Sequence, residues 1–314
     1  MRRRRRASTR HGWPILLAGV LAAIAACGST PPPAGPPRDA PSPPMNSAAP
    51  SAVTTATDSA TTTVPSADHV VVVVMENKDV DQVLGDGKAP FLDQLARTGA
   101  DFTDAHAETH PSQPNYLALF SGDTQGVTDG SCLRGLAAPN LATQLQAAGR
   151  SFVGYSESLP SPGFTGCRSG DYAQKHSPWS AFTNVPAGAS QPWNAWPASF
   201  DRLPTVAFVT PDLCSDMHDC SVGVGDRWLA DNLSSYLEWA RSHNSLLIVT
   251  IDESESRRGD NGIVTLIDGA RVRPGQVDEP VDHYRLLRTI EQMYQLPPLG
   301  RAAAVPPITD IWTP

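Results

Sequence analysis

The chain has 314 residues, of which 24 are basic and 32 acidic, and a formal net charge of −8. Without the six arginines that precede Cys27, the basic residues fall to 18 and the net charge becomes −14. Such a surface offers no basic track for a nucleic-acid backbone, so we exclude nucleic acid as a partner. The charge does not argue against small anionic substrates, because a bound cation would dominate the local field.

The first residues predict an export signal over 1–26. Six arginines precede an apolar run, Ile15 to Ala26, which is too short to span a bilayer as a mature helix. The end of this run, Ile24-Ala25-Ala26-Cys27, fits the lipobox pattern, in which the cysteine is lipidated. We therefore predict an outward-facing cell-membrane lipoprotein, partly secreted. The alternative is an ordinary secretory signal in which Cys27 has no special role.

The segment 27–67 consists mostly of Pro, Ala, Ser and Thr and contains no aromatic residue. It cannot bury enough apolar surface to fold, so we predict a disordered tether followed by one domain over 68–314. That length is enough for a single large hydrophobic core.

Strands and helices alternate along the domain, which predicts an α/β fold with a largely parallel central sheet and helices on both faces. The segment 156–200, rich in Pro, Gly, Ser and Trp, predicts a long irregular excursion over the sheet edge. The predicted strands are 69–75, 100–105, 151–155, 205–210, 246–251 and 263–267, and the predicted helices are 89–98, 112–120, 139–148, 225–241 and 283–294.

Four cysteines remain after Cys27, an even number in a chain with an export signal. Two disulfides are therefore expected, and four cysteines allow three connectivities. The short interval favours Cys214 with Cys220, which leaves Cys132 with Cys167. A zinc site is the alternative, but no pair has the CxxC spacing.

Acidic residues end two apolar strands. Glu76-Asn77 follows the run Val70 to Met75, and Asp252-Glu253 follows Leu246 to Ile251. Open α/β sheets bind their ligands at the carboxyl ends of the strands, so these acids predict a cation site. Read alone, each would be an ordinary polar strand exit.

Ser112 stands at a predicted helix start, where free backbone N–H groups and the helix dipole favour a bound anion such as a phosphoryl group. The alternative is a plain helix N-cap. The loop 210–220 adds Asp212, Asp216, His218 and Asp219, a density of oxygen and imidazole groups that suits metal or phosphate.

Six motifs together resemble one family over 68–314: the bacterial phosphoesterases that include acid phosphatases and phospholipases C, within the alkaline phosphatase superfamily. The motifs are Val-Val-Met-Glu-Asn-Lys at 73–78, His-Pro-Ser-Gln-Pro-Asn-Tyr at 110–116, Ser-Gly at 121–122, Asp-Met-His-Asp at 216–219, Asp-Glu at 252–253 and His-Tyr-Arg-Leu-Leu-Arg-Thr-Ile-Glu at 283–291.

The resemblance implies a metal-dependent hydrolase that acts through a phosphoserine. The Ser-x-Pro-Asn of 112–115 is similar to the Thr-Phe-Pro-Asn of nucleotide pyrophosphatases, which makes Ser112 the nucleophile. The divalent cation, of unknown identity and one or two in number, would be bound by Glu76, Asn77, Ser112, Asp252 and Glu253.

The resemblance further implies that histidines hold phosphate oxygens or protonate the leaving group, with His218, His283, His110 and His106 as candidates. Read alone, His283 would be a capping or core histidine. Asp216 and Asp219 would orient these imidazoles or, with Asp212, supply a second metal site.

Two positions depart from the family pattern. Asp79 replaces the usual Ser or Thr after the Glu-Asn pair, and Ser215 replaces the usual Asn before the 216–219 motif. The chain also shows no appended domain, which favours a phosphomonoesterase over a phospholipase C or another phosphodiesterase. The leaving group would be selected by residues of the excursion, namely Tyr172, Lys175, His176 and Trp179, unless these only pack the long loop.

Other classes of protein remain as alternatives. A serine hydrolase would need a G-x-S-x-G elbow, which does not occur. A non-catalytic surface lipoprotein has no reason to keep every proposed ligand. We predict as partners a small phosphate-ester substrate and the membrane through a lipid anchor, with no obligate protein partner.

Overall fold

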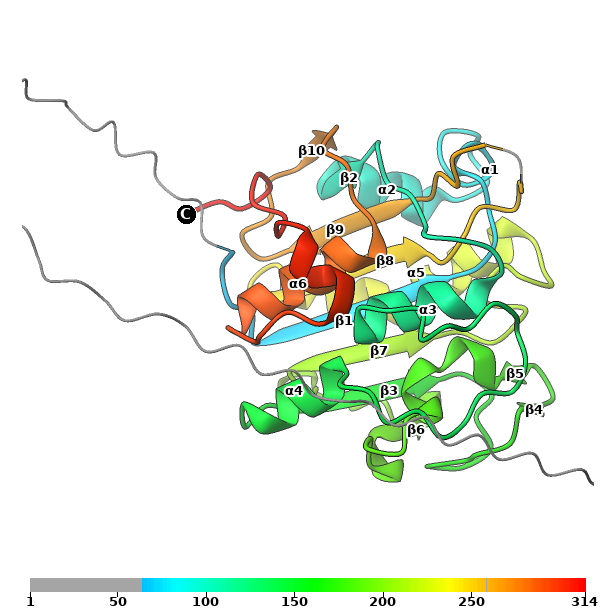
Figure 1. The fold of residues 1–314 in the computed structure, drawn as a ribbon. Helices are drawn as coiled ribbons and strands as arrows, with labels where there is room; N and C mark the ends of the chain where they lie inside the picture. Colours follow the sequence, from blue (N-terminus) through cyan, green and yellow to red (C-terminus); the bar gives the residue numbers. More distant parts are fainter. Residues whose placement is uncertain (1–63, 258) are drawn as a thin grey trace, which may run out of the picture. The chain divides into compact units, whose positions relative to one another are not determined.

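The computed structural model describes residues 64–257 and 259–314 (Figure 1). The predicted signal peptide, Cys27 and nearly all of the predicted tether lie outside these residues, so those assignments stay predictions. The last tether residues are described, and Val64 and Ala67 are buried against the domain core. Among the described residues, no helix is both long and apolar enough to cross a membrane.

The core of the domain is an eight-stranded sheet. Its strands run in the order β10-β2-β9-β8-β1-β7-β3-β6, counted from one edge to the other. In chain order they are β1 (His69–Met75), β2 (Ala100–Phe102), β3 (Phe152–Ser156), β6 (Ser190–Pro192), β7 (Val206–Thr210), β8 (Ser245–Ile251), β9 (Thr265–Gly269) and β10 (Gly275–Val277).

The sheet is mostly parallel, as predicted. Strand β1 lies between β7 and β8 and is parallel to both, with Val70 beside Val206 on one side and Leu246 on the other. The valines 70–74 are all buried, because a central parallel strand is covered on both faces and needs no polar side. Only β9 runs antiparallel, between β8 and β2.

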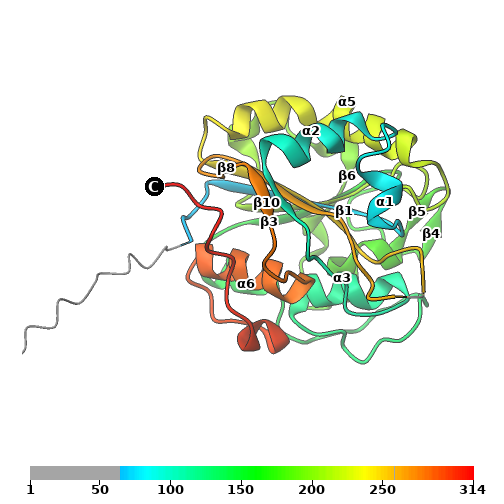
Figure 2. The ribbon, with the colours of Figure 1, turned by 90° about the horizontal axis from the view of Figure 1, so that it is seen from above.

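Helices cover both faces of the sheet (Figure 2). Helices α2 and α5 pack together on one face, and α3 and α6 pack together on the other. The helices are α1 (Val80–Val83), α2 (Pro90–Thr98), α3 (Ser112–Ser121), α4 (Leu141–Ala147), α5 (Val222–Ala240) and α6 (His283–Met293).

Helix α2 is capped from outside its own segment. Ala89, at its N-cap, makes no side-chain capping bond. The buried Asp226 of α5 instead accepts hydrogen bonds from the backbone N–H groups of Leu92 (2.9 Å) and Phe91 (3.2 Å). The carboxylate satisfies two of the free donors at the start of α2 and joins it to α5.

Most element boundaries agree with the prediction to within one or two residues. Helix α5 begins three residues early, at Val222, although two glycines occupy its first turn. One of them is required by packing, because a Cβ at Gly225 would lie 2.5 Å from Met217 Cγ. The strand predicted over 100–105 ends at Phe102, and the one predicted from 263 begins at Thr265.

The excursion predicted over 156–200 is largely irregular and includes the edge strand β6. It contains the two-residue strands β4 (Arg168–Ser169) and β5 (Tyr172–Ala173) and several short 3₁₀ helices. Trp179 packs flat on the sheet, where a Cβ at Gly154 would lie 2.1 Å from its ring. Trp179 is 1% exposed, so it packs the loop and does not select a leaving group.

Candidate active site

The acids predicted at two strand ends lie next to each other. Met75 and Ile251 are partners in the β1–β8 register, and Glu76 and Asp252 follow them directly. The next peptide turns sharply, with Asn77 at a φ of 57°, and the Asn77 N–H donates to Asp252 Oδ1 at 3.0 Å. The two strand ends are thereby connected.

Ser112 lies between two carboxylates. Its Oγ is 3.0 Å from Glu76 Oε2 and 3.0 Å from Glu253 Oε1, so the hydroxyl can donate its proton to either. Ser112 is the first residue of α3 and only 4% exposed. Glu253 Oε2 is also 2.6 Å from His110 Nδ1, which places the predicted His110 beside the nucleophile candidate through that carboxylate.

His176 contacts Glu76 at Oε1, the carboxylate oxygen that Ser112 does not contact. It ends the 3₁₀ helix η1 (Gln174–His176) of the excursion, and its ring stacks on Tyr116 with centroids 5.3 Å apart. Nε2 lies 2.8 Å from Glu76 Oε1, and Nδ1 lies 3.0 Å from Asp216 Oδ2. The buried imidazole therefore bridges two buried carboxylates.

These contacts shift the protonation of all three groups. Burial alone would lower the pKa of His176, but the charges of Glu76 and Asp216 outweigh burial and raise that pKa to about 9. Burial works against ionisation of Glu76, yet the facing imidazolium lowers its pKa to about 2. Burial raises the pKa of Asp216 to about 6. A metal-free site is thus partly neutralised by His176.

The charge of the remaining acids is less well balanced. Burial, together with the charges of Glu76 and Glu253, raises the pKa of Asp252 well above its usual range. Its Oδ2 is buried without a hydrogen-bond partner among the described residues. Buried carboxylate oxygens of this kind need a proton or a cation.

The residues present fit a divalent cation. Among the described residues, Glu76 Oε1, His176 Nε2 and Asp216 Oδ2 have no partner of hydrogen-bond geometry beyond the ion pairs that His176 makes with the two carboxylates. Ligand atoms of Glu76, His176 and Asp216 lie within 4.8 Å of one another. Clustered carboxylate oxygens with one imidazole suit a hard or intermediate divalent ion.

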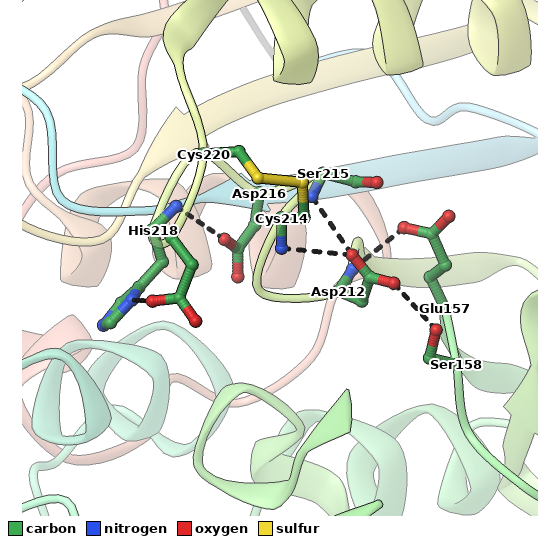
Figure 3. Close-up of a disulfide and its surroundings, with 9 residues drawn as sticks. Glu157, Ser158, Asp212, Cys214, Ser215, Asp216, His218 and Cys220 are labelled. Carbon is green, nitrogen blue, oxygen red and sulfur yellow. Dashed lines mark hydrogen bonds and ion pairs between the residues drawn. A yellow bond between two sulfur atoms is a disulfide. The ribbon is translucent and has the colours of Figure 1, made fainter. Parts of the chain in front are cut away.

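His218 stands at the rim of the site. Its backbone N–H donates to Asp216 Oδ1 at 2.8 Å (Figure 3). Its Nδ1 is 2.6 Å from Asp219 Oδ1, and its Nε2 is 3.5 Å from Lys175 Nζ. Its ring centroid is 6.0 Å from that of His176. Asp219 is therefore in a position to orient the imidazole of His218.

Asp212, one of the acids considered for a second metal site, uses its carboxylate in hydrogen bonds to nearby loop residues. Its Oδ1 accepts from the backbone N–H groups of Cys214 and Ser215, both at 3.1 Å, and its Oδ2 accepts from Ser158 at 2.7 Å (Figure 3). Its oxygens are used to cap the turn that carries the Cys214–Cys220 disulfide. This disulfide and Cys132–Cys167 are both formed, which confirms the predicted pairing.

Two predicted histidines point elsewhere. His283 is buried, with Nδ1 2.6 Å from Glu108 Oε2 and Nε2 3.1 Å from the Ile251 carbonyl, so both nitrogens are occupied. His106 contacts Asp104 at 2.8 Å and the Asp260 carbonyl at 3.0 Å. Neither contacts the carboxylates around Ser112. His283 supports the end of β8, and the phosphate-contacting role predicted for it is wrong for this geometry.

Three residues around the site were missed or misread. Glu108, the partner of His283, lies two residues before the 110–116 motif, a position that could have drawn attention to it. Asn261 accepts from the Ser254 N–H and donates to the carbonyls of Ala107 and Thr109, but no motif marks it. His176 was considered only for leaving-group selection, because its partners are far away in sequence.

The model of the phosphoesterase family matches residues 86–297. The chain belongs to the phosphoesterase family. Phosphatidylinositol-3-phosphatase of Mycobacterium tuberculosis is 49% identical over 247 residues, which cover 78% of this chain and 82% of that protein. A probable acid phosphatase of Kluyveromyces lactis is 31% identical, over 73% of this chain and 59% of the yeast protein.

Solved structures agree on the fold. A protein of the alkaline phosphatase superfamily from Vibrio parahaemolyticus superposes with a TM-score of 0.52 at 13% identity, covering 77% of this chain and 71% of that one. A lipoteichoic acid synthase of Listeria monocytogenes gives 0.53 at 9% identity, covering 75% and 73%. This phosphoesterase is thus a hydrolase of phosphate esters with an alkaline-phosphatase-like fold, and its disulfides fit an exported protein.

Proposed function

We propose that the protein is an exported, metal-dependent phosphomonoesterase that works through a phosphoserine at Ser112. The observation that carries the proposal is the position of Ser112 Oγ, 3.0 Å from each of two carboxylates in a group of buried acids. A hydroxyl in this position can lose its proton to a neighbouring carboxylate. The start of α3 supplies backbone N–H groups for the incoming phosphate.

Glu76, Asn77, Asp252 and Glu253 are the residues that would hold a divalent cation beside Ser112. When bound, such an ion favours the ionised form of the serine hydroxyl and screens the negative charge of the substrate phosphate. The buried Asp252 Oδ2, which lacks a hydrogen-bond partner, supports this assignment.

The protein residues then carry out two displacements. Ser112 Oγ gives its proton to Glu76 or Glu253 and attacks phosphorus, while the bond from phosphorus to the leaving oxygen breaks. His218, oriented by Asp219, protonates the leaving oxygen. In the second displacement water gives a proton to His218 and attacks the phosphoserine, the bond between Oγ and phosphorus breaks, and Ser112 regains its proton from the glutamate that took it.

The relatives support a phosphomonoester as the substrate. A phosphatidylinositol-3-phosphatase at 49% identity supports a phosphomonoester, including a phosphoinositide, over a diester. The acid phosphatase relatives support the same reaction type. A phospholipase C or another phosphodiesterase acting at the same site is the alternative. Export and membrane attachment through Cys27 are part of the proposal, and the disulfides support export.

The test measures hydrolysis of p-nitrophenyl phosphate and bis(p-nitrophenyl) phosphate by the full chain, with and without chelator. We expect chelator-sensitive activity that favours the monoester and falls by on the order of 1,000-fold or more in Ser112→Ala. Ser234→Ala, on the exposed side of α5, is the matched control. Metal analysis counts the ions per chain, and acid quenching followed by mass spectrometry detects the phosphoserine.

Full activity in Ser112→Ala would move the nucleophile to another residue. Activity that survives chelator would remove the cation from the mechanism. Preference for the diester would establish the alternative function.

A further inference from the structure

A small cavity adjoins the rim of the active site. Its volume is about 200 Å³, and we call it the rim subsite; Gly130, Cys132, Cys167, Arg168, Gln174 and Lys175 line it. Two of these residues are cationic and none is acidic. Among the described residues, no carboxylate lies within ion-pair distance of Arg168 or Lys175, although the charge of Lys175 also acts on the carboxylate of Glu76.

Lys175 connects the rim subsite with the residues around Ser112. Lys175 Nζ is 3.5 Å from His218 Nε2, and Lys175 directly precedes His176, which contacts Glu76. On the other side, Gln113 follows Ser112. With its amide nitrogen turned toward the facing loop, it donates to the carbonyls of Ser131 (2.9 Å) and Asp129 (3.1 Å).

The backbone around Lys175 is firmly held. The Gln174 N–H donates to the Cys167 carbonyl at 3.0 Å, and the Gln174 side chain bonds both the N–H (3.2 Å) and the carbonyl (3.0 Å) of Leu133. The Cys132–Cys167 disulfide crosslinks the same two segments. The lysine stem passes Gly130, where a Cβ would lie 3.5 Å from Lys175 Cδ. The ammonium group is therefore presented from a fixed position.

We propose that the rim subsite binds a second anionic group, carried by the leaving group of the phosphate ester, and that Lys175 is the residue that selects it. This inference rests on the proposed function, because His218 marks the side from which the leaving group departs. An anion on that leaving group meets Lys175 immediately beyond His218 and then Arg168. Two cations without carboxylate partners provide charge-assisted contacts for it.

The test compares two matched substrates, 1,3-propanediol monophosphate and 1,3-propanediol bisphosphate, with the full chain. We expect kcat/KM to favour the bisphosphate by about 10-fold or more, beyond the factor of two for its two equivalent ends. In Lys175→Met the ratio of the two kcat/KM values falls to about that statistical factor, and in Lys175→Arg most of the preference returns. Lys88→Met, which removes a lysine paired with Asp86 on the surface, leaves the ratio as in the wild type.

A ratio that stays unchanged in Lys175→Met overturns the inference, and so does a wild type without preference for the bisphosphate. If the wild type hydrolyses neither substrate, the proposed function has failed instead, so the two failures can be distinguished. Two further pairs of substrates identify the source of the second anion. Dibutanoyl phosphatidylinositol 3-phosphate is compared with inositol 3-phosphate to test a lipid anion. Inositol 1,3-bisphosphate is compared with the same monophosphate to test a soluble anion. A Lys175-dependent preference in either pair supports the subsite and identifies the source of the anion.

Discussion

Glu76 and Asp252 stand at the ends of adjacent parallel strands, whereas His176 and Asp216, which complete the group, come from loops. The strand ends are fixed by the register of β1 and β8, which matches seven residue pairs from His69 with Ser245 to Met75 with Ile251. The loop residues depend on side-chain contacts and on two disulfides. We call Glu76 and Asp252 the strand wall, and His176 and Asp216 the loop wall.

The difference shows two ways of holding buried charge. The strand wall cannot move without breaking ladder hydrogen bonds, so it can carry several acids close together despite their repulsion. The loop wall is held by side-chain contacts and two disulfides. It supplies the imidazole of His176, which partly balances the charge of those acids. The following variants separate the two contributions.

Asp252→Asn affects the strand wall most strongly. Loss of this carboxylate should lower kcat/KM by on the order of 1,000-fold, because it removes a fixed charge from the position of the proposed cation. In chelator the same change should raise the free energy of unfolding by about 1 kcal/mol, because the buried Asp252 carboxyl must take up a proton when the metal-free chain folds and the amide does not. Denaturant unfolding and kinetics measure both effects. The control is Glu255→Gln, an exposed acid three residues along the same loop. Lower stability together with unchanged activity would contradict the assignment.

The two disulfides should separate stability from activity in the loop wall. Cys132 and Cys167 are 35 residues apart and Cys214 and Cys220 only 6, so replacing each pair by alanine should cost about 4 and about 2 kcal/mol of unfolding free energy. We expect the reverse order for activity, because the shorter loop carries Asp216 and His218. Thermal unfolding and kcat/KM of both variants test the order. Equal losses of activity would show that the loop wall moves as one unit.

His283 tests the support behind the strand wall. We expect His283→Gln and Glu108→Gln each to lower the unfolding free energy by about 3 kcal/mol, because each leaves a buried partner unpaired. The double variant should cost less than the sum, and kcat should fall by only about 10-fold. A fall in kcat of more than 100-fold with unchanged stability would instead restore the role predicted from the sequence.

Glu291 lies outside both walls and provides a reference for pH. Burial raises its pKa to about 7 in the folded protein, from an ordinary value of 4.5. The unfolded chain loses this proton first, so the contribution to stability is present below pH 4.5 and disappears as the pH rises to about 7. Between pH 5 and 8, the free energy of unfolding of the wild type should therefore fall by about 2 kcal/mol more than that of Glu291→Gln. Urea unfolding measures this difference. Identical pH profiles would refute this effect of burial.

The strand wall could be predicted from the sequence, and the loop wall only in part. Buried parallel strands leave a continuous run such as Val70 to Val74, and the acids that end two such runs must meet if the strands are neighbours. The pairing of four cysteines was also predicted, from one short interval. Both inferences start from local sequence patterns, and in each case the fold brings the residues of the pattern into contact.

The remaining features of the site depend on pairs that no local pattern connects. His176 contacts Glu76, 100 residues earlier, and His283 contacts Glu108, 175 residues earlier. The acids of 212–219 look alike in sequence, yet Asp212 caps a turn, Asp216 contacts His176 and Asp219 orients His218. Their roles are decided by the path of the loop, which the sequence does not show.

The carboxylate of Asp226 has a consequence for the order in which the chain folds. Helix α2 receives the cap at its start from α5, which begins more than 120 residues later. A nine-residue helix without this cap is only marginally stable in water. We therefore expect α2 to become stable only after α5 has docked against it.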